Sequence, residues 1–261
     1  MILAAQSKGD GPRTLVLLHG LFGQARNLGV IAREFAPRFR VISLDLRNHG
    51  ASPHSWDMDY ATLAADVWET LEALGVTECS LLGHSMGGKA AMMAALLRPT
   101  AVQALVVIDI APKLYQHHND RVARAMQALA LDRPMIRRDA DAVLAPEIPD
   151  AGTRRFLLQN FIAGDQPGWG IGLDEIALGI SDIEGWPADS ATKRFDGPSM
   201  FVGGALSDYV AAEDLPLMRR FFPRAELVMV EGAGHWVHAD RPQELLEILQ
   251  GFLSYTNPPK E

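Results

Sequence analysis

The sequence of 261 residues contains one cysteine, no long apolar run and no excess of basic residues. A single cysteine cannot form a disulfide within the chain, so we expect Cys79 to be a small buried hydrophobe in a protein of the reducing cytoplasm. Without an apolar run of about 20 residues or a basic N-terminal segment, the sequence predicts neither a membrane span nor a secretory signal. The net charge of −8 argues against nucleic acid and membrane surfaces as partners and favours small molecules.

Short apolar runs alternate with helical patterns along most of the chain. The runs are rich in Val, Ile and Leu and cover residues 14–19, 40–46, 78–83, 104–110, 199–203 and 226–230. Their nearly continuous hydrophobicity is typical of parallel strands that are covered on both faces. Helices are expected over residues 60–74, directly after Ser85, and from Asp240 onward. This alternation predicts an α/β fold with a doubly wound, mostly parallel sheet of about seven or eight strands.

Residues 113–196 interrupt this alternation, because they contain no clear strand pattern. Arginine-rich helical stretches, RVARAMQALA and TRRFLLQNFIA, are separated by segments rich in Pro and Gly. Apolar and aromatic side chains are too frequent here for a flexible linker. We therefore expect residues 113–196 to form a mainly helical cap, inserted into a core domain of residues 1–112 and 197–261.

Ser85 lies between Gly83 and Gly87 in the stretch LLGHSMGGK. It follows an apolar strand and precedes a helix, at the carboxyl end of a parallel sheet, where α/β proteins place their sites. The two glycines lack the Cβ atoms that would clash in a tight strand-to-helix turn, and such a turn exposes the serine hydroxyl. A turn that only permits close packing would have the same sequence, but the flanking strand and helix favour a nucleophile.

A serine hydroxyl is a weak nucleophile until a base takes its proton, and His235 is the candidate base. It lies in EGAGHWVHADRP, between the last strand and the last helix, in a loop flanked by glycines. His238 is the local alternative and is expected to stabilise the loop instead. His84, adjacent to Ser85, is expected to be packed and to point away from the hydroxyl.

The carboxylate that would orient this histidine has two candidates. Asp208 follows the penultimate strand, the usual position in the chain order serine, acid, histidine. Asp109 ends the strand that comes after the Ser85 unit, and it could reach the same histidine from the neighbouring strand. Position alone slightly favours Asp208, and either aspartate could support the other.

Backbone N–H groups that could bind a negatively charged oxygen are expected from two turns. The strand that ends at His19 leads into the turn GLFG, where the N–H of Leu21 or Phe22 could point at the site. The N–H of Met86 begins the helix after Ser85. The two turns together predict an oxyanion hole.

Three further polar residues near the strand ends are expected to be structural. His19 closes the first turn, and Arg47 and His49 in the loop DLRNHGAS are expected to brace that loop with hydrogen bonds.

These motifs resemble the α/β-hydrolase fold superfamily, in particular the YbfF-type esterases and the abhydrolase-domain serine esterases. The matching stretches are LLHGLFG, LDLRNHGASPH, GHSMGGKAAM, VVIDIAP, FLLQNF and GAGHWVHADRP, in the expected order over nearly the whole chain. G-x-S-x-G is common to the superfamily, whereas RNHG, Gly88-Lys89 and IDIAP are specific to the subgroup. The resemblance implies a serine esterase that needs no cofactor or metal. It also implies that Ser207 and Asp109 share the role of the acid, but Asp208 departs from the subgroup and leaves the acid open.

The predicted function is a serine carboxylic-ester hydrolase that works through an acyl-enzyme on a small-molecule acyl ester or thioester. The same Ser/His/Asp set also fits carbon–carbon bond hydrolases, lyases, haloperoxidase-like enzymes and a non-catalytic small-ligand binder, which stay alternatives. Candidates for an acyl pocket are the cap residues Phe161, Trp169 and Trp186, with Met126, Leu129 and Phe156, although residues at helical spacing more often form cap core. Arg121 and Arg124 could meet the phosphates of an acyl-CoA. We expect a cytoplasmic monomer or homodimer.

Overall fold

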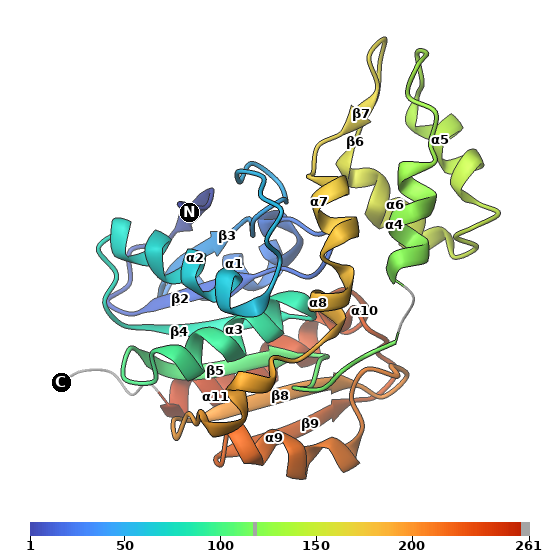
Figure 1. The fold of residues 1–261 in the computed structure, drawn as a ribbon. Coiled ribbons are helices and arrows are strands. Elements are labelled where there is room, and N and C mark those ends of the chain that lie inside the picture. Colours follow the sequence, from blue (N-terminus) through green and yellow to red (C-terminus); the bar gives the residue numbers. More distant parts are fainter. Residues whose placement is uncertain (117–118, 257–261) are drawn as a thin grey trace.

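The computed structural model describes residues 1–116 and 119–256 and contains one large sheet flanked by helices (Figure 1). In these residues the sheet has seven strands in the order β1-β3-β2-β4-β5-β8-β9, and β1 alone runs antiparallel to its neighbour. The strands are β1 (Ala5–Lys8), β2 (Thr14–Leu18), β3 (Arg40–Leu44), β4 (Cys79–His84), β5 (Val102–Ile108), β8 (Ser199–Gly204) and β9 (Ala225–Val230). The predicted fold class and the six predicted strands are confirmed. Strand β1 was not predicted because its four residues are exposed and carry no apolar pattern.

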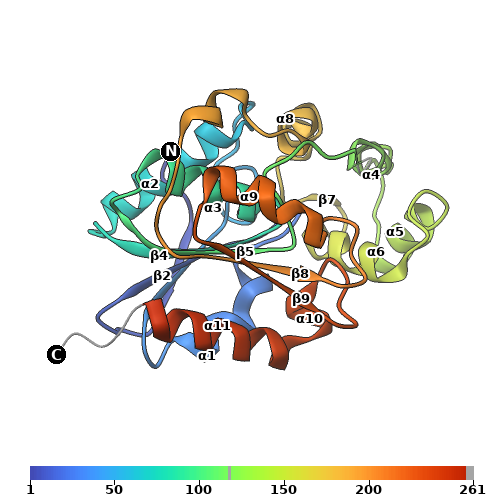
Figure 2. The same cartoon turned by 90° about the horizontal axis from the view of Figure 1, so that it is seen from below.

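Helices cover both faces of the sheet, as Figure 2 shows. One face is covered by α2 (Tyr60–Ala73), α3 (Met86–Leu97) and α9 (Leu215–Phe221), and the other by α1 (Gly29–Phe35) and α11 (Pro242–Thr256). Alternate side chains of one strand enter opposite layers: in β2, Val16 and Leu18 join the core on the α3 side, whereas Leu15 and Leu17 join the core on the α1 side. Burial on both faces explains the nearly continuous apolar runs.

Helix boundaries follow local signals in the sequence. The Asp59 side chain accepts a hydrogen bond from the Thr62 N–H at 2.9 Å and caps α2, a contact typically worth about 1 kcal/mol. A short helix, α10 (Val237–Asp240), precedes α11, which begins at Pro242. Within the described residues, no helix is both long and apolar enough to cross a membrane. Cys79 is fully buried, and burial raises the pKa of its thiol to about 12.

The segment 113–196 leaves the sheet after β5 and returns to it at β8. Its described α-helices are α4 (Asn119–Gln127), α5 (Arg137–Leu144), α6 (Ala151–Leu157), α7 (Leu173–Leu178) and α8 (Ile180–Glu184). Two short 3₁₀ helices lie at Leu158–Asn160 and Ala188–Thr192. In Figure 1 most of these elements extend beyond one side of the sheet. The segment also contains two short antiparallel strands, β6 (Phe161–Ile162) and β7 (Gly168–Trp169).

Strand β6 corrects the expectation that the stretch TRRFLLQNFIA is helical throughout. The helix gives way to a 3₁₀ turn and then to β6. The buried Asn160 side chain donates to the Phe22 carbonyl at 2.7 Å and accepts from the Gln24 side chain at 2.6 Å. The two bonds join Asn160 to residues that are 138 and 136 positions away in the sequence, and they hold the backbone where the helix ends. Tertiary contacts therefore override the local helical preference.

Close packing of α3 against the sheet depends on glycines. A Cβ atom on Gly83 would lie 2.1 Å from the Gly87 carbonyl oxygen, and one on Gly87 would lie 2.3 Å from the Leu18 carbonyl oxygen. Both distances are far inside van der Waals contact with backbone atoms, which cannot rotate away. The turn between β4 and α3 therefore exists only with small residues at these two positions.

We expect Gly87→Ala to destabilise the protein by about 2 kcal/mol or more, because the added methyl group overpacks the backbone of β2. The measurement is the free energy of unfolding in urea. The matched control is Gly251→Ala in α11, where a Cβ meets nothing within 4 Å; it should stabilise the protein by about 0.5–1 kcal/mol. Equal stabilities for the two variants would contradict the packing described here.

Candidate active site

Ser85 occupies the turn between β4 and α3. Its φ of 52° and ψ of −121° lie in a region that non-glycine residues rarely adopt. Its N–H donates to the Ile108 carbonyl at 2.9 Å, which ties the turn to β5. Backbone strain of this kind costs about 1–3 kcal/mol and persists only where the surroundings impose it. The turn therefore holds the Ser85 hydroxyl in a defined place at the carboxyl end of the sheet.

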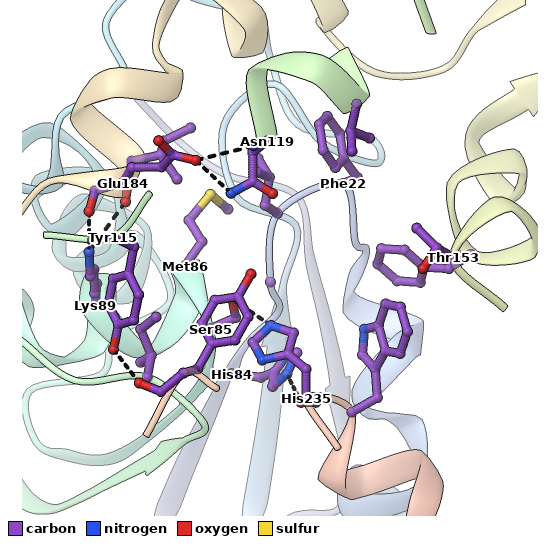
Figure 3. Close-up of a pocket in the computed structure, with 18 of the residues that line it drawn as sticks. Phe22, His84, Ser85, Met86, Lys89, Tyr115, Asn119, Thr153, Glu184 and His235 are labelled. Atoms are coloured by element: carbon purple, nitrogen blue, oxygen red, sulfur yellow. Dashed lines mark hydrogen bonds between the residues drawn. The ribbon is translucent and has the colours of Figure 1, made fainter. Parts of the chain in front are cut away.

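The His235 imidazole lies between Ser85 and Asp109, and its side towards Ser85 is visible in Figure 3. Its Nε2 is 3.0 Å from the Ser85 Oγ, and its Nδ1 is 2.7 Å from the Asp109 Oδ2. The Tyr209 ring stacks on the imidazole with 3.8 Å between ring centroids, and His84 Nε2 is 2.8 Å from the His235 carbonyl oxygen. An Nδ1 that donates to the carboxylate leaves Nε2 as the acceptor for the serine proton.

Asp109, and not Asp208, lies against the histidine. The Asp109 carboxylate is fully buried and accepts from the Gly204 N–H at 2.8 Å and from the Ser207 hydroxyl, as well as from His235. Asp208 is exposed. The slight preference for Asp208 on chain position is thus corrected by the geometry: β5 and β8 are neighbours in the sheet, so the end of β5 reaches the histidine directly.

His238 does not contact Ser85, and it packs beside His84 with 4.8 Å between ring centroids. Burial lowers the pKa of His238 to about 4, so this imidazole is neutral near pH 7. Burial also lowers the pKa of His84 well below its usual value, assisted by the neighbouring histidines. His84 is packed, as expected, and it holds the backbone of His235 instead of the serine hydroxyl.

The two turns predicted to supply backbone donors meet at Ser85, with one correction. The Phe22 N–H donates to His49 Nε2 at 3.0 Å and so points away from the cavity. The N–H groups of Leu21 and Met86 make no hydrogen bond within the part of the chain that the structure describes, and both residues line the cavity that contains Ser85. Leu21 and Met86 are therefore the donors that this geometry leaves for an oxyanion.

Comparisons with known proteins agree with this architecture. A family model described as the α/β hydrolase fold matches residues 13–141. The sn-1-specific diacylglycerol lipase of Danio rerio is 39% identical over 94% of this chain and 80% of its own. The esterase YbfF of Escherichia coli (strain K12) is 35% identical over 92% of each chain. The chain belongs to the α/β-hydrolase family. Among solved structures, a marine microorganism esterase superimposes with a TM-score of 0.92, at 33% identity over 97% of this chain and 99% of that one.

Buried histidines brace the loops of this α/β hydrolase. His19 Nε2 accepts from the Leu46 N–H at 3.0 Å, and Nδ1 of His19 contacts the Gly20 carbonyl at 2.8 Å. Burial lowers the pKa of His19 to about 4 and of His49 to about 3, so both rings are neutral and can accept these bonds. Arg47 donates to Asp66 at 2.6 Å. The structural roles predicted for these three residues are confirmed.

A cavity of about 270 Å³ lies above Ser85. It is lined by residues near the strand ends and by residues of the segment 113–196: Gly20, Leu21, Phe22, Tyr60, His84, Ser85, Met86, Lys89, Ile110, Tyr115, Asn119, Val122, Thr153, Phe156, Leu157, Ile183, Glu184, Tyr209, His235 and Trp236. Figure 3 shows Ser85 and His235 between two ends, one with Lys89, Tyr115 and Glu184 and the other with Phe22 and Thr153. Among the described residues, no group of three or more His, Cys, Asp or Glu is placed to hold a metal ion.

Phe161, Trp169 and Trp186, the predicted pocket residues, do not line this cavity. Phe161 packs edge-on against Trp169, whose indole N–H donates to the Met126 carbonyl. Trp186 packs between Tyr60 and Phe221. Met126 and Leu129 are also buried in packing. Of the aromatic candidates only Phe156 reaches the cavity, because helical spacing does not distinguish a packing face from a cavity wall.

Lys89 is a polar residue of the cavity that the sequence revealed only through the resemblance. It lies on α3 and is 1% exposed, and its ammonium donates to the carbonyls of Glu184 at 2.9 Å and Gly185 at 2.6 Å, with Ile183 at 3.4 Å. Burial lowers the pKa of Lys89 to about 7, partly opposed by the Glu184 charge. A cation at the C-terminus of α8 is favourable, because the last carbonyls of a helix carry partial negative charge. A sign of its role in the sequence is that Lys89 is the single charged residue in the otherwise apolar stretch of α3.

We expect Asp109→Asn to lower kcat about 10³- to 10⁴-fold, because the amide cannot hold the imidazole in the productive tautomer or stabilise its charged form. The measurement is steady-state hydrolysis of a p-nitrophenyl ester. The matched variant Asp208→Asn removes an exposed carboxylate and should change kcat less than about twofold. The reverse ranking would assign the acid to Asp208.

Lys89→Met should loosen α8 from α3, since the carbonyls at the helix end lose a charged donor worth about 1.5–3 kcal/mol. We expect faster hydrogen exchange of the α8 amides and a fall of about tenfold in kcat/KM. The free energy of unfolding is not a suitable measurement here, because methionine also removes the cost of burying a charge, and the two effects oppose each other. The control is Lys113→Met, which breaks the partly exposed ion pair with Asp214. Unchanged hydrogen exchange of the α8 amides in Lys89→Met would show that Lys89 does not hold α8 in place.

Proposed function

We propose that the protein is a serine carboxylic-ester hydrolase in which Ser85 is the nucleophile, His235 the general base and Asp109 the acid. The observation that carries the proposal is the line of contacts from the Ser85 Oγ through both nitrogens of His235 to a buried carboxylate. The names of the relatives, a diacylglycerol lipase and two esterases, support the same reaction class.

The reaction follows from the positions of these groups. The Ser85 Oγ attacks the ester carbonyl while its proton passes to His235 Nε2. The N–H groups of Leu21 and Met86 donate to the negative oxygen that forms, and removal of one such donor typically costs 10²- to 10³-fold in rate. His235 then gives its proton to the departing alcohol or thiol, which leaves an acyl group on Ser85. A water molecule, deprotonated by the same imidazole, releases the acid.

Asp109 stabilises the imidazolium that forms in each step. Ser207 supports Asp109 as a positioning residue, since its hydroxyl donates to the same carboxylate oxygen that faces His235. With donors from Gly204, Ser207 and His235, the buried carboxylate has hydrogen-bond partners on both of its oxygens. This arrangement requires no cofactor or metal.

We further propose that residues 113–196 act as a cap on a core of residues 1–112 and 197–261. Val122, Phe156 and Ile183 from this segment line the cavity above Ser85. Contacts of Lys89 with the end of α8 join cap and core. The substrate is a small acyl ester or thioester whose reacting carbonyl reaches Ser85 beneath the cap. The cytoplasmic location and the monomeric or dimeric state stay predictions.

Ser85→Ala should lower kcat at least about 1000-fold, since only binding and the oxyanion donors would then assist hydrolysis. Mass spectrometry after treatment with a fluorophosphonate probe should show one adduct on the intact protein, at Ser85, and none on Ser85→Ala. A protein that folds but forms no adduct would be a non-catalytic binder. An adduct without turnover of esters would favour the other chemistries of the family.

A further inference from the structure

A second hollow lies next to the active-site cavity and has a different character. This groove has a volume of about 430 Å³ and is bounded by the 3₁₀ turn Ala25–Leu28, α1, α6 and α10. It is lined by Arg26, Asn27, Gly29, Val30, Arg33, Gly152, Arg155, Phe156, Gln159, Trp236, His238, Ala239 and Asp240. Phe156 and Trp236 line both hollows, with 5.5 Å between their ring centroids, and so form a shared wall.

Three exposed arginines give this groove a positive charge. Arg26, Arg33 and Arg155 come from three different elements, and none of them pairs with a carboxylate in the described parts of the chain. Arg26 donates only to the Gln159 carbonyl, at 3.3 Å. Asp240 also lines the groove, but its carboxylate accepts from the Gly234 N–H at 2.8 Å. Three arginines against one aspartate still leave a local excess of positive charge in the groove, in a chain with a net charge of −8.

The two arginines that the sequence singled out in the segment 113–196 pair with carboxylates. Arg121 lies 3.2 Å from Glu147, and Arg124 lies 2.6 Å from Asp120. Neither arginine lines the cavity or the groove, so the expectation that these two meet acyl-CoA phosphates finds no support in the structure. The arginines beside the active site are a different set.

We take the groove as the exit for the departing part of the substrate, because it adjoins the active-site cavity at Phe156 and Trp236. The leaving oxygen or sulfur has to reach His235 Nε2 to receive its proton, and Trp236 follows His235 directly in the chain. A group that leaves past Trp236 and Phe156 enters the groove. A phosphate group on a biological ester or thioester is carried by the alcohol or thiol part, since the acyl part is built from a carboxylic acid.

We propose that Arg26, Arg33 and Arg155 form a subsite for a phosphate group on the alcohol or thiol part of the substrate. Guanidinium groups bind phosphate through paired N–H donors, and unpaired arginines in a concave surface also steer anions toward it. The inference rests on the proposed function, because it assigns the leaving-group side from the role of His235. The phosphate could belong to a thiol carrier or to a glycerolipid, since the chemistry recognised is the same.

Two matched substrate pairs test this subsite. S-acyl phosphopantetheine is compared with S-acyl pantetheine, and 1-acylglycerol 3-phosphate with 1-acylglycerol, so that each pair differs by one phosphate. The variant combines Arg26→Gln, Arg33→Gln and Arg155→Gln. Its control combines substitutions to Gln of arginines that lie outside the groove and next to carboxylates, with the same change in net charge: Arg121, Arg124 and Arg138.

For at least one pair, we expect the groove variant to lose about tenfold or more in kcat/KM on the phosphorylated member and less than twofold on the other. The pair affected identifies the source of the phosphate. Added salt should slow wild type on the phosphorylated substrate and should have little effect on the groove variant. Equal changes on both members of both pairs, or the same loss in the control, would overturn the subsite.

Failure of the proposed function would look different. In that case wild type would hydrolyse neither member of either pair and would form no fluorophosphonate adduct at Ser85. Hydrolysis of the unphosphorylated members with no preference that depends on these arginines would refute the subsite alone. Melting temperatures of the variant and control show whether both proteins are folded.

Discussion

The buried carboxylate of Asp109 is the constraint on which the arrangement of the active site depends. A carboxyl group with no exposure is tolerable only where donors surround it, and the donors come from Gly204 at the end of β8, from Ser207 after β8 and from His235 after β9. Asp109 itself has a φ of 51°, so the end of β5 is bent to deliver the side chain. One buried carboxyl group thus brings together the ends of three neighbouring strands, and the loop that contains His235 is bonded to that group.

A second requirement is the close approach of α3 to the sheet. Gly83 and Gly87 let the helix begin directly over β4 and β2, which places the Ser85 hydroxyl and the Met86 N–H at the same point. One turn later, Lys89 on the same helix holds the end of α8. The proposed nucleophile, one proposed oxyanion donor and the contact with α8 therefore lie at or on a single helix, and a displacement of α3 would disturb all three.

Much of this was accessible from the sequence, for identifiable reasons. The strands follow from their apolar runs, and Ser85 and His235 follow from their places at strand ends, because chain order and local pattern carry that information. The choice between Asp109 and Asp208 depends on which strands are neighbours and on one positive φ, and neither is written in a local pattern. The choice between the N–H groups of Leu21 and Phe22 stayed open because the partner of the Phe22 N–H, His49, lies 27 residues away in the sequence. Phe161, Trp169 and Trp186 were misjudged because packing decides which side of an amphipathic element faces a cavity.

The stacking of Tyr209 on His235 has a consequence for the energetics of the reaction. The imidazole is held at Nδ1 by Asp109, across one face by Tyr209, and through its backbone carbonyl by His84. A ring held at these three points keeps its orientation when it gains a proton, so little free energy goes into reorganising it during a turnover. Such a site is ready before the substrate arrives. The motions that remain for the catalytic cycle are then those of residues 113–196. The entry and exit of ligands, more than the alignment of His235, would limit the turnover rate.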